Sequence, residues 1–249
     1  MSSTCRPVGD VGMAEAFYVG AYWGPRGEPV EGCARRLSIL LSALAEVDPL
    51  LTSWFKTAGS RKVALQRQID PAAESLRELL VSGQARRDDA SRSVMTELGY
   101  SADMWNGQSA QVGLRVRCGS PAAIPGMASN TLALQLPAAE GDALALYQRQ
   151  VALALMRSVV TAWEPSWCTW TNHRLRKTQG PQPGEVVVGW ATYVADRVGV
   201  RADRLPSGVT TEQLGTGLLL IADGDAGSAS ADTVSAVRAA LGPALRSAS

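Results

Sequence analysis

The chain has 249 residues, enough for one large domain or two small ones, with 46% hydrophobic and 19% charged residues. Its 24 basic and 23 acidic residues give a formal net charge of +1. This balance excludes a strongly basic protein that binds nucleic acid nonspecifically and a strongly acidic DNA mimic, but it allows a local patch of either sign.

The N-terminal residues lack the apolar core of a signal peptide, and no stretch reaches the roughly 18 apolar residues of a transmembrane helix. The four cysteines are scattered and form no Cys-x-x-Cys motif. In a chain of this length they favour reduced thiols over a disulfide scaffold. We therefore expect a cytoplasmic protein with a flexible N-terminal tail at 1–13 and one α+β domain at 14–249.

The first predicted elements are a strand at about 15–23 and a helix at about 29–47. Aromatic and β-branched residues favour the strand, and the turn Trp23-Gly-Pro-Arg26 ends it. In the helix, apolar residues recur at spacings of three and four, which predicts one buried face. Asp48-Pro49 ends this helix, because the residue before a proline avoids the helical region.

The rest of the chain mixes predicted helices and strands. The apolar segment at 49–55 is predicted to pack back on the first helix. Because helices and strands do not alternate strictly, we predict an α+β fold, a single compact domain with a mostly antiparallel sheet and several helices. The further predicted helices are 60–69, 72–83, 141–163 and 231–241, and the further predicted strands are 111–118, 131–136, 167–172, 185–195 and 217–223.

Residues that could carry out catalysis are few. The single histidine, His173, follows Cys168 by five residues, a spacing that places the two side chains on opposite faces of a strand. A nucleophile needs its base within hydrogen-bond reach, so a dyad would require a bulge or turn between them. Asp223 and Asp225 flank a glycine, a pattern more typical of a turn than of an acid or cation site. We predict no catalytic residue, metal or cofactor, since no zinc spacing, dinucleotide fingerprint or Walker loop occurs.

Tryptophan is unusually frequent, with seven residues against two phenylalanines. On a strand Trp167 and Trp170 point to opposite faces, so we expect at least one to fall short of the core. The basic residues Arg174, Arg176 and Lys177 follow. One interpretation is core tryptophan beside a solvated basic turn. The other is an aromatic and arginine contact surface, because Trp, Tyr and Arg dominate interface hot spots. The balanced net charge disfavours single-stranded nucleic acid as the partner.

Several short segments together resemble one family. They are Tyr18–Arg26, Cys33–Leu37, Asp48–Trp54 and Val188–Tyr193, and they are similar to the Immunity protein 52 family of bacterial polymorphic toxin systems. The resemblance implies a non-catalytic, cytoplasmic antidote in a type VI secretion context. Its partner would be a cognate nuclease toxin of restriction-endonuclease-like fold, encoded nearby, with no direct contact to nucleic acid or membrane.

The leading hypothesis is therefore an immunity protein that neutralises a secreted nuclease toxin by stoichiometric complex formation. Two alternatives stay open: a small cytosolic hydrolase that uses Cys168 or the Asp223/Asp225 pair, and a peptide- or nucleic-acid-binding module. The candidate partner-binding residues are Trp167, Trp170, Arg174 and Arg176.

Overall fold

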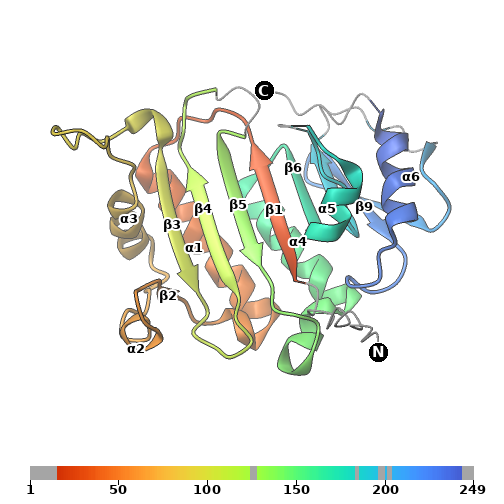
Figure 1. The fold of residues 1–249 in the computed structure, drawn as a ribbon, viewed down its shortest axis with the longest axis horizontal. Helices are drawn as coiled ribbons and strands as arrows, with labels where there is room; N and C mark the ends of the chain where they lie inside the picture. Colours follow the sequence, from red (N-terminus) through yellow and green to blue (C-terminus); the bar gives the residue numbers. More distant parts are fainter. Residues whose placement is uncertain (1–15, 124–127, 183–184, 196–199, 201–203, 243–249) are drawn as a thin grey trace, which may run out of the picture.

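A computed structural model of the chain describes residues 16–123, 128–182, 185–195, 200 and 204–242 (Figure 1). The predicted tail at 1–13 lies outside these residues. The strands are β1 (Phe17–Trp23), β2 (Phe55–Lys56), β3 (Tyr100–Trp105), β4 (Gly113–Cys118), β5 (Asn130–Gln135), β6 (Trp167–Asn172), β7 (Ala191–Ala195), β8 (Val209–Leu214) and β9 (Gly217–Ala222). The α-helices are α1 (Val30–Val47), α2 (Arg61–Ala64), α3 (Ala73–Ser82), α4 (Arg149–Trp163), α5 (His173–Gln179) and α6 (Ala231–Leu241), and the 3-10 helices are η1 (Pro49–Leu51), η2 (Thr96–Leu98) and η3 (Gly141–Tyr147).

The nine described strands form one sheet in the order β2-β3-β4-β5-β1-β6-β7-β9-β8. Every pairing between them is antiparallel. The predicted α+β class with a mostly antiparallel sheet is confirmed. The first strand of the chain, β1, lies in the middle of the sheet, between β5 and β6.

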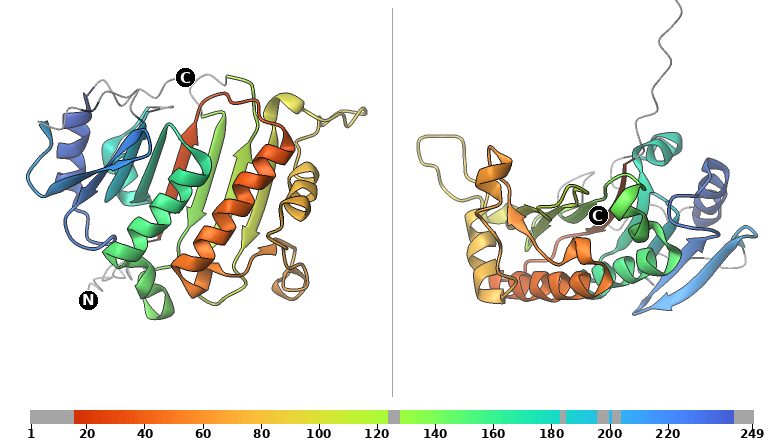
Figure 2. Two further views of the ribbon diagram at one scale, coloured as in Figure 1. Left: turned by 180° about the vertical axis from the view of Figure 1, so that it is seen from behind. Right: turned by 90° about the horizontal axis from the view of Figure 1, so that it is seen from below.

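The two sides of the sheet are covered differently. Helices α1 and α4 lie next to each other across one side, the helix side (Figure 2). On the opposite side, α5 and α6 lie near the β6–β9 end of the sheet. Within the described part of the chain, that opposite side of β3, β4, β5 and β1 has helices only at its two edges, where Arg61 of α2 lies over the ring of Trp105 and His173 of α5 lies beside Tyr18. We call this area, made by the outward residues of those four strands, the open face.

The core fills the helix side. Alternate residues of β1, from Phe17 to Trp23, point toward the helices, and Trp23 stacks on Trp163 of α4 with ring centroids 5.4 Å apart. The predicted helix at 29–47 is confirmed as α1, and its buried stripe includes Leu37, Leu40 and Leu44. Each such leucine contributes about 1.5–3 kcal/mol through burial. β1 and α1 thus both contribute large buried side chains to the core.

The predicted helix at 141–163 is wrong in about its first third. Residues 141–147 form the 3-10 helix η3, and Gln148 is extended before α4 begins. The backbone at this break has partners elsewhere: the carbonyl of Tyr147 accepts from the amide of Ala226 at 3.0 Å, and the amide of Arg149 donates to Asp225 at 3.1 Å. These tertiary hydrogen bonds replace those of a continuous helix.

Two other predicted elements are shorter than expected. The helix at 60–69 is the single turn α2, because the amide of Ile69 donates to the carbonyl of Trp54 and draws this segment into an extended connection. The predicted strand at 185–195 is confirmed only from Ala191, where β7 begins. The side chain of Gln179 hydrogen-bonds both the amide and the carbonyl of Val188, so these groups are not available to a neighbouring strand. The elements β2, β3, β8 and α5 were not predicted.

Candidate functional site

The structure separates the possible catalytic pair Cys168 and His173. Cys168 lies on the helix side of β6, opposite Ala21 in the pairing with β1, and is fully buried. Burial raises the pKa of this thiol well above its usual value. His173 is the exposed first residue of α5, and its ring lies 5.6 Å from that of Tyr18, on the other side of the sheet. A thiol in this setting is not an activated nucleophile.

The second candidate pair, Asp223 and Asp225, lies in the turn between β9 and α6, as predicted. Asp225 accepts the amide of Arg149 at the start of α4, and the Arg149 guanidinium donates to the carbonyls of Ala222 at 2.8 Å and Gly224 at 3.2 Å. These contacts give the turn a structural role. Among the residues described, no group of three or more His, Cys, Asp or Glu side chains could hold a metal ion.

The two tryptophans proposed for partner binding are both buried. Trp170 is 0% exposed and lies on the helix side, edge-on to Tyr147 and Trp190. Trp167 is 5% exposed and lies on the opposite side, stacked on Tyr22 with ring centroids 4.0 Å apart. The prediction of opposite faces is correct. The expectation that one ring falls short of the core is wrong, because Tyr22 covers the second ring.

The basic residues after β6 lie on a helix, and the predicted solvated turn is wrong. The Asn172 side chain accepts the amide of Leu175 at 2.7 Å and begins α5, whose Leu175 is buried. An asparagine in this position is a strong signal for the start of a helix, although no helix was predicted here. The exposed residues of α5 include Arg174, Arg176 and Lys177.

One group of side chains from β1, β6 and α5 forms an aromatic–basic cluster, which we define as Tyr18, Tyr22, Trp167, His173 and Arg176. Burial raises the pKa of both tyrosines, and the nearby Arg176 guanidinium opposes the rise. No described residue is in hydrogen-bond geometry with the buried hydroxyl of Tyr18. Of the four residues proposed for partner binding, Trp167 and Arg176 belong to this cluster, Arg174 is on the same helix, and Trp170 is on the far side of the sheet.

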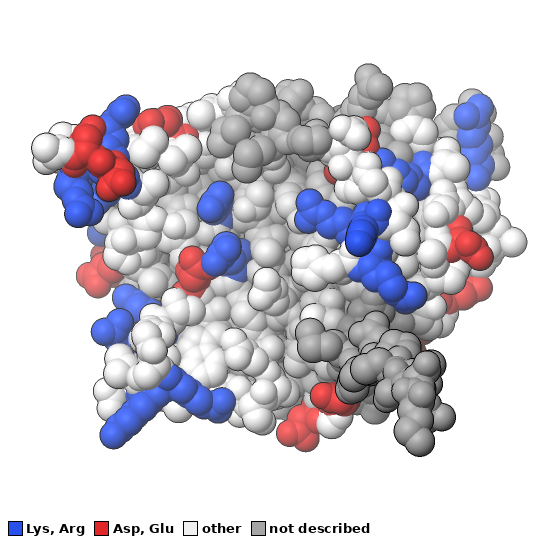
Figure 3. Space-filling model, in the orientation of Figure 1, with Lys and Arg blue, Asp and Glu red and all other residues white. Residues whose placement is uncertain are grey.

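The open face beside the cluster carries its own charges. Arg115 and Arg117 are exposed on β4, and Arg115 forms an ion pair with Asp103 of β3. Lys and Arg atoms gather on this side of the molecule over β4 and over α5 (Figure 3). This group was not predicted from the sequence, where only the alternation of Leu114, Arg115, Val116 and Arg117 indicates that both arginines share one side of a strand.

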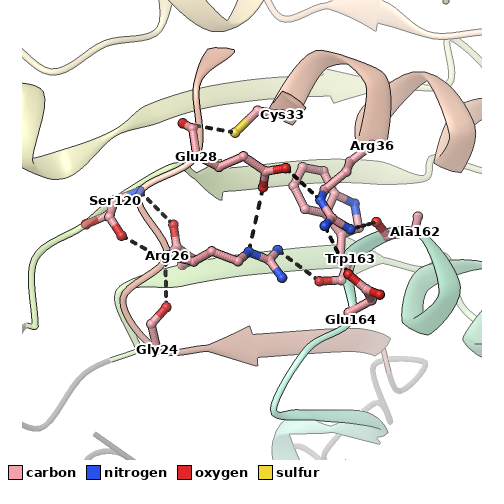
Figure 4. A network of polar contacts seen from close by, with 10 residues as sticks. Gly24, Arg26, Glu28, Cys33, Arg36, Ser120, Ala162, Trp163 and Glu164 are labelled. Atoms are coloured by element: carbon pink, nitrogen blue, oxygen red, sulfur yellow. Dashed lines mark hydrogen bonds and ion pairs between the residues drawn. The ribbon is translucent and has the colours of Figure 1, made fainter. Parts of the chain in front are cut away.

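Residues of the turn after β1 and of the first turns of α1 build a second charged group at the end of α4 (Figure 4). Arg36 pairs with Glu28 at 2.9 Å and with Glu164 at 2.9 Å, and it donates to the carbonyl of Ala162 at 2.9 Å. Arg26 donates to the carbonyl of Trp163, also at 2.9 Å. Two cations thus satisfy the free carbonyls at the C-terminus of α4, where the helix dipole favours positive charge. This group supports the fold and lies on the helix side of the sheet.

Comparison with known proteins gives one family. The family model described as Immunity protein 52 matches residues 15–229. No curated protein matches the sequence. Among solved structures, a Pseudomonas aeruginosa T6SS protein, PA0821, is similar with a TM-score of 0.49 and 13% identity, over 94% of this chain and 74% of that one. None of the helices in the described ranges is both long and apolar enough to cross a membrane.

Proposed function

The chain belongs to the Immunity protein 52 family, and from this membership we propose that it neutralises a cognate secreted nuclease toxin by forming a stoichiometric complex with it. The toxin is encoded nearby, and the complex forms in the cytoplasm of the producing cell. The protein catalyses no reaction and needs no cofactor. The type VI secretion system is the proposed route by which the toxin reaches neighbouring cells.

The arrangement of the candidate residues supports binding over catalysis. Cys168 is buried away from His173, and Asp225 is engaged at the start of α4. These positions support neither Cys168 nor the Asp223/Asp225 pair as the active site of a hydrolase. The observation that carries the proposal is the aromatic–basic cluster, which combines the residue types that dominate protein interfaces.

We propose different roles for the four partner-binding candidates. Trp167 and Trp170 hold β6 rigid from its two sides through their stacking and edge contacts. β6 leads directly into α5, whose start is fixed by Asn172. Arg174 and Arg176 then contact the toxin from a preorganised helix. Such preorganisation reduces the entropy lost on binding and favours the slow dissociation that an antidote needs.

The test is to purify the protein together with the toxin encoded by the neighbouring gene. We expect the two to co-elute from a size-exclusion column and nuclease activity to end at an equimolar ratio. The double variant Arg174→Ala/Arg176→Ala should release the inhibition. The matched control is Arg35→Ala, an exposed arginine on the outer surface of α1. A toxin that is not bound at submicromolar concentration contradicts the proposal.

A further inference from the structure

We infer that the toxin docks on the open face together with α5, and that it presents an acidic, carboxylate-rich surface there. This inference rests on the proposed function and specifies the surface and the chemistry of the partner. It is drawn from the strand register, the distribution of charge and the small side chains in the middle of the sheet.

The register of the sheet places Arg117 of β4 in one row with two members of the aromatic–basic cluster, Tyr22 and Trp167. Arg117 of β4 is paired with Thr131 of β5, and Thr131 is paired with Tyr22 of β1, which is in turn paired with Trp167. Directly paired residues point to the same side of a sheet, and neighbouring strands are about 4.8 Å apart. The backbones of Arg117 and Tyr22 are therefore roughly 10 Å apart. One protein partner can cover both at once.

The charge on this surface is mainly positive. The outward residues of β3, β4, β5 and β1 include three charged ones, Asp103, Arg115 and Arg117, and the first two neutralise each other. Helix α5 carries Arg174, Arg176 and Lys177 and contains no Asp or Glu. Within the described residues, neither Arg117 nor Arg176 has a carboxylate partner. A partner that supplies carboxylates would form ion pairs with Arg117 and Arg176.

The outer surface of α1 has a different character. Glu31 and Arg35 lie four residues apart there, and Glu31 pairs with Arg77 of α3 at 3.1 Å. Its charges are mixed in sign, and Glu31 is already paired. The excess of positive charge therefore distinguishes the open face and α5 from the opposite side of the molecule.

The middle of the open face consists of small residues. The row through Arg115 continues with Ala133 and Gly20, and Gly113 is the first residue of β4. Ala133 and Gly113 are both partly exposed. The short side chains of Ala133 and Gly113 let a partner approach the strand backbones closely while the longer arginines reach around it, whereas the ring of Tyr22 covers the backbone at Gly20.

A protein partner suits this surface better than single-stranded nucleic acid. Nucleic acid of that kind is bound by exposed aromatic rings on which bases stack. Here Trp167 is covered by Tyr22, and Tyr18 is buried. The exposed groups on this surface include Arg115, Arg117 and Gln135, and the partly exposed ring of Tyr22 already has one face stacked on Trp167.

The experiment measures binding to a catalytically inactivated form of the neighbouring toxin by biolayer interferometry at low and high salt. The test variant is Arg117→Glu/Arg176→Glu, and the matched control is Arg35→Glu on the outer surface of α1. We expect the test variant to weaken the Kd by about tenfold or more, chiefly through slower association, and the control to stay within about twofold. Wild-type binding should weaken as salt rises.

Hydrogen exchange of the wild-type complex provides a second measurement that does not depend on the folding of a variant. Protection should appear at β4, β5, β1 and α5, and not on the outer surface of α1. If the wild-type protein binds the toxin but the test variant binds equally well, or protection appears elsewhere, the docking surface is wrong and the proposed function stands. If the wild-type protein does not bind the toxin, both fail. Binding of an oligonucleotide of single-stranded DNA as tightly as the toxin would also overturn the inference.

Discussion

The ring of Tyr22 lies across the backbone of Gly20, so closely that a Cβ at Gly20 would be 2.6 Å from the hydroxyl oxygen of Tyr22. The absent side chain lets the ring lie flat on the sheet. In that position it stacks on Trp167 of the neighbouring strand. The glycine in the middle of β1 is thus explained by the packing of an aromatic pair.

The variant Gly20→Ala should displace the Tyr22 ring and weaken its stacking on Trp167. We expect it to lower the free energy of unfolding by about 1 kcal/mol, the range in which aromatic pairs and overpacking act. Denaturant unfolding, followed by tryptophan fluorescence, measures this. The control is Gly113→Ala on the same side of the sheet, where the nearest atom to a new Cβ is 3.8 Å away. It should be neutral or slightly stabilising. An equal loss in both variants would contradict the explanation.

The variant Arg36→Met should destabilise the protein more than the same substitution at an exposed arginine. It removes the ion pairs to Glu28 and Glu164 and leaves the carbonyl of Ala162 without its donor. For a side chain that is 25% exposed we expect a loss of about 2 kcal/mol in the free energy of unfolding. The adjacent exposed residue offers the control Arg35→Met, expected within about 0.5 kcal/mol of wild type. Thermal unfolding of both variants and the wild type measures this difference, and an equal loss of stability in the two variants would contradict the prediction.

The pair Arg157–Glu212 joins α4 to β8 and should make stability depend on pH. Both guanidinium contacts are short, at 2.8 and 2.6 Å, but the two side chains are 39% and 36% exposed. Hydrogen bonds from Arg157 lower the pKa of Glu212 in the folded protein. The carboxylate therefore stabilises the fold above its unfolded pKa of about 4.3, and this stabilisation is lost as the pH falls through the lower folded value.

The variant Glu212→Gln should accordingly cost about 0.5 kcal/mol at neutral pH, a small value because solvent screens the pair. The difference from wild type should fade as the pH falls below about 4.3. Denaturant titrations across this pH range measure it, with the exposed Glu140→Gln as the control. A difference that grows toward acid pH would show that the pair does not act as described.

The cysteines provide a test of the hydrolase alternative. Cys33, Cys118 and Cys168 are all free and buried. In the background Cys5→Ser, the native protein should react negligibly with an aromatic disulfide reagent at neutral pH, since buried thiols are inert. All three thiols should react once the protein is unfolded in concentrated guanidinium chloride. Rapid labelling of Cys168 in the native state would bring the nucleophile hypothesis back.

Local signals in the sequence predicted some elements well and others not at all. The buried stripe of α1 and the alternation in β4 are strong patterns, and both elements are where they were expected. β8 escaped prediction because its Val-Thr-Thr-Glu-Gln-Leu sequence lies at the edge of the sheet and has little of the alternation of a half-buried strand. The break at Gln148 escaped because hydrogen bonds to residues 225 and 226 cause it.

The candidate site was predictable only in part for a similar reason. Residue types near Trp167 pointed to an interface, and Arg176 does lie beside that ring system. The partnership of Tyr22 with Trp167 depends on the pairing of β1 with β6, which no local pattern encodes. The place of Arg117 in the same row depends on two further pairings, β4 with β5 and β5 with β1.

The central position of β1 also affects how the protein is made. This strand leaves the ribosome before the other described strands, yet Gln135, its partner for Tyr18, follows about 120 residues later, and Asn172, its partner for Phe17, more than 150 residues later. At roughly 5–20 residues per second, translation leaves an apolar strand without neighbours for on the order of ten seconds. Non-local pairing of this kind folds slowly and exposes a chain to aggregation meanwhile. We therefore expect nascent chains of this protein to be prone to aggregation until the residues up to β6 have been synthesised.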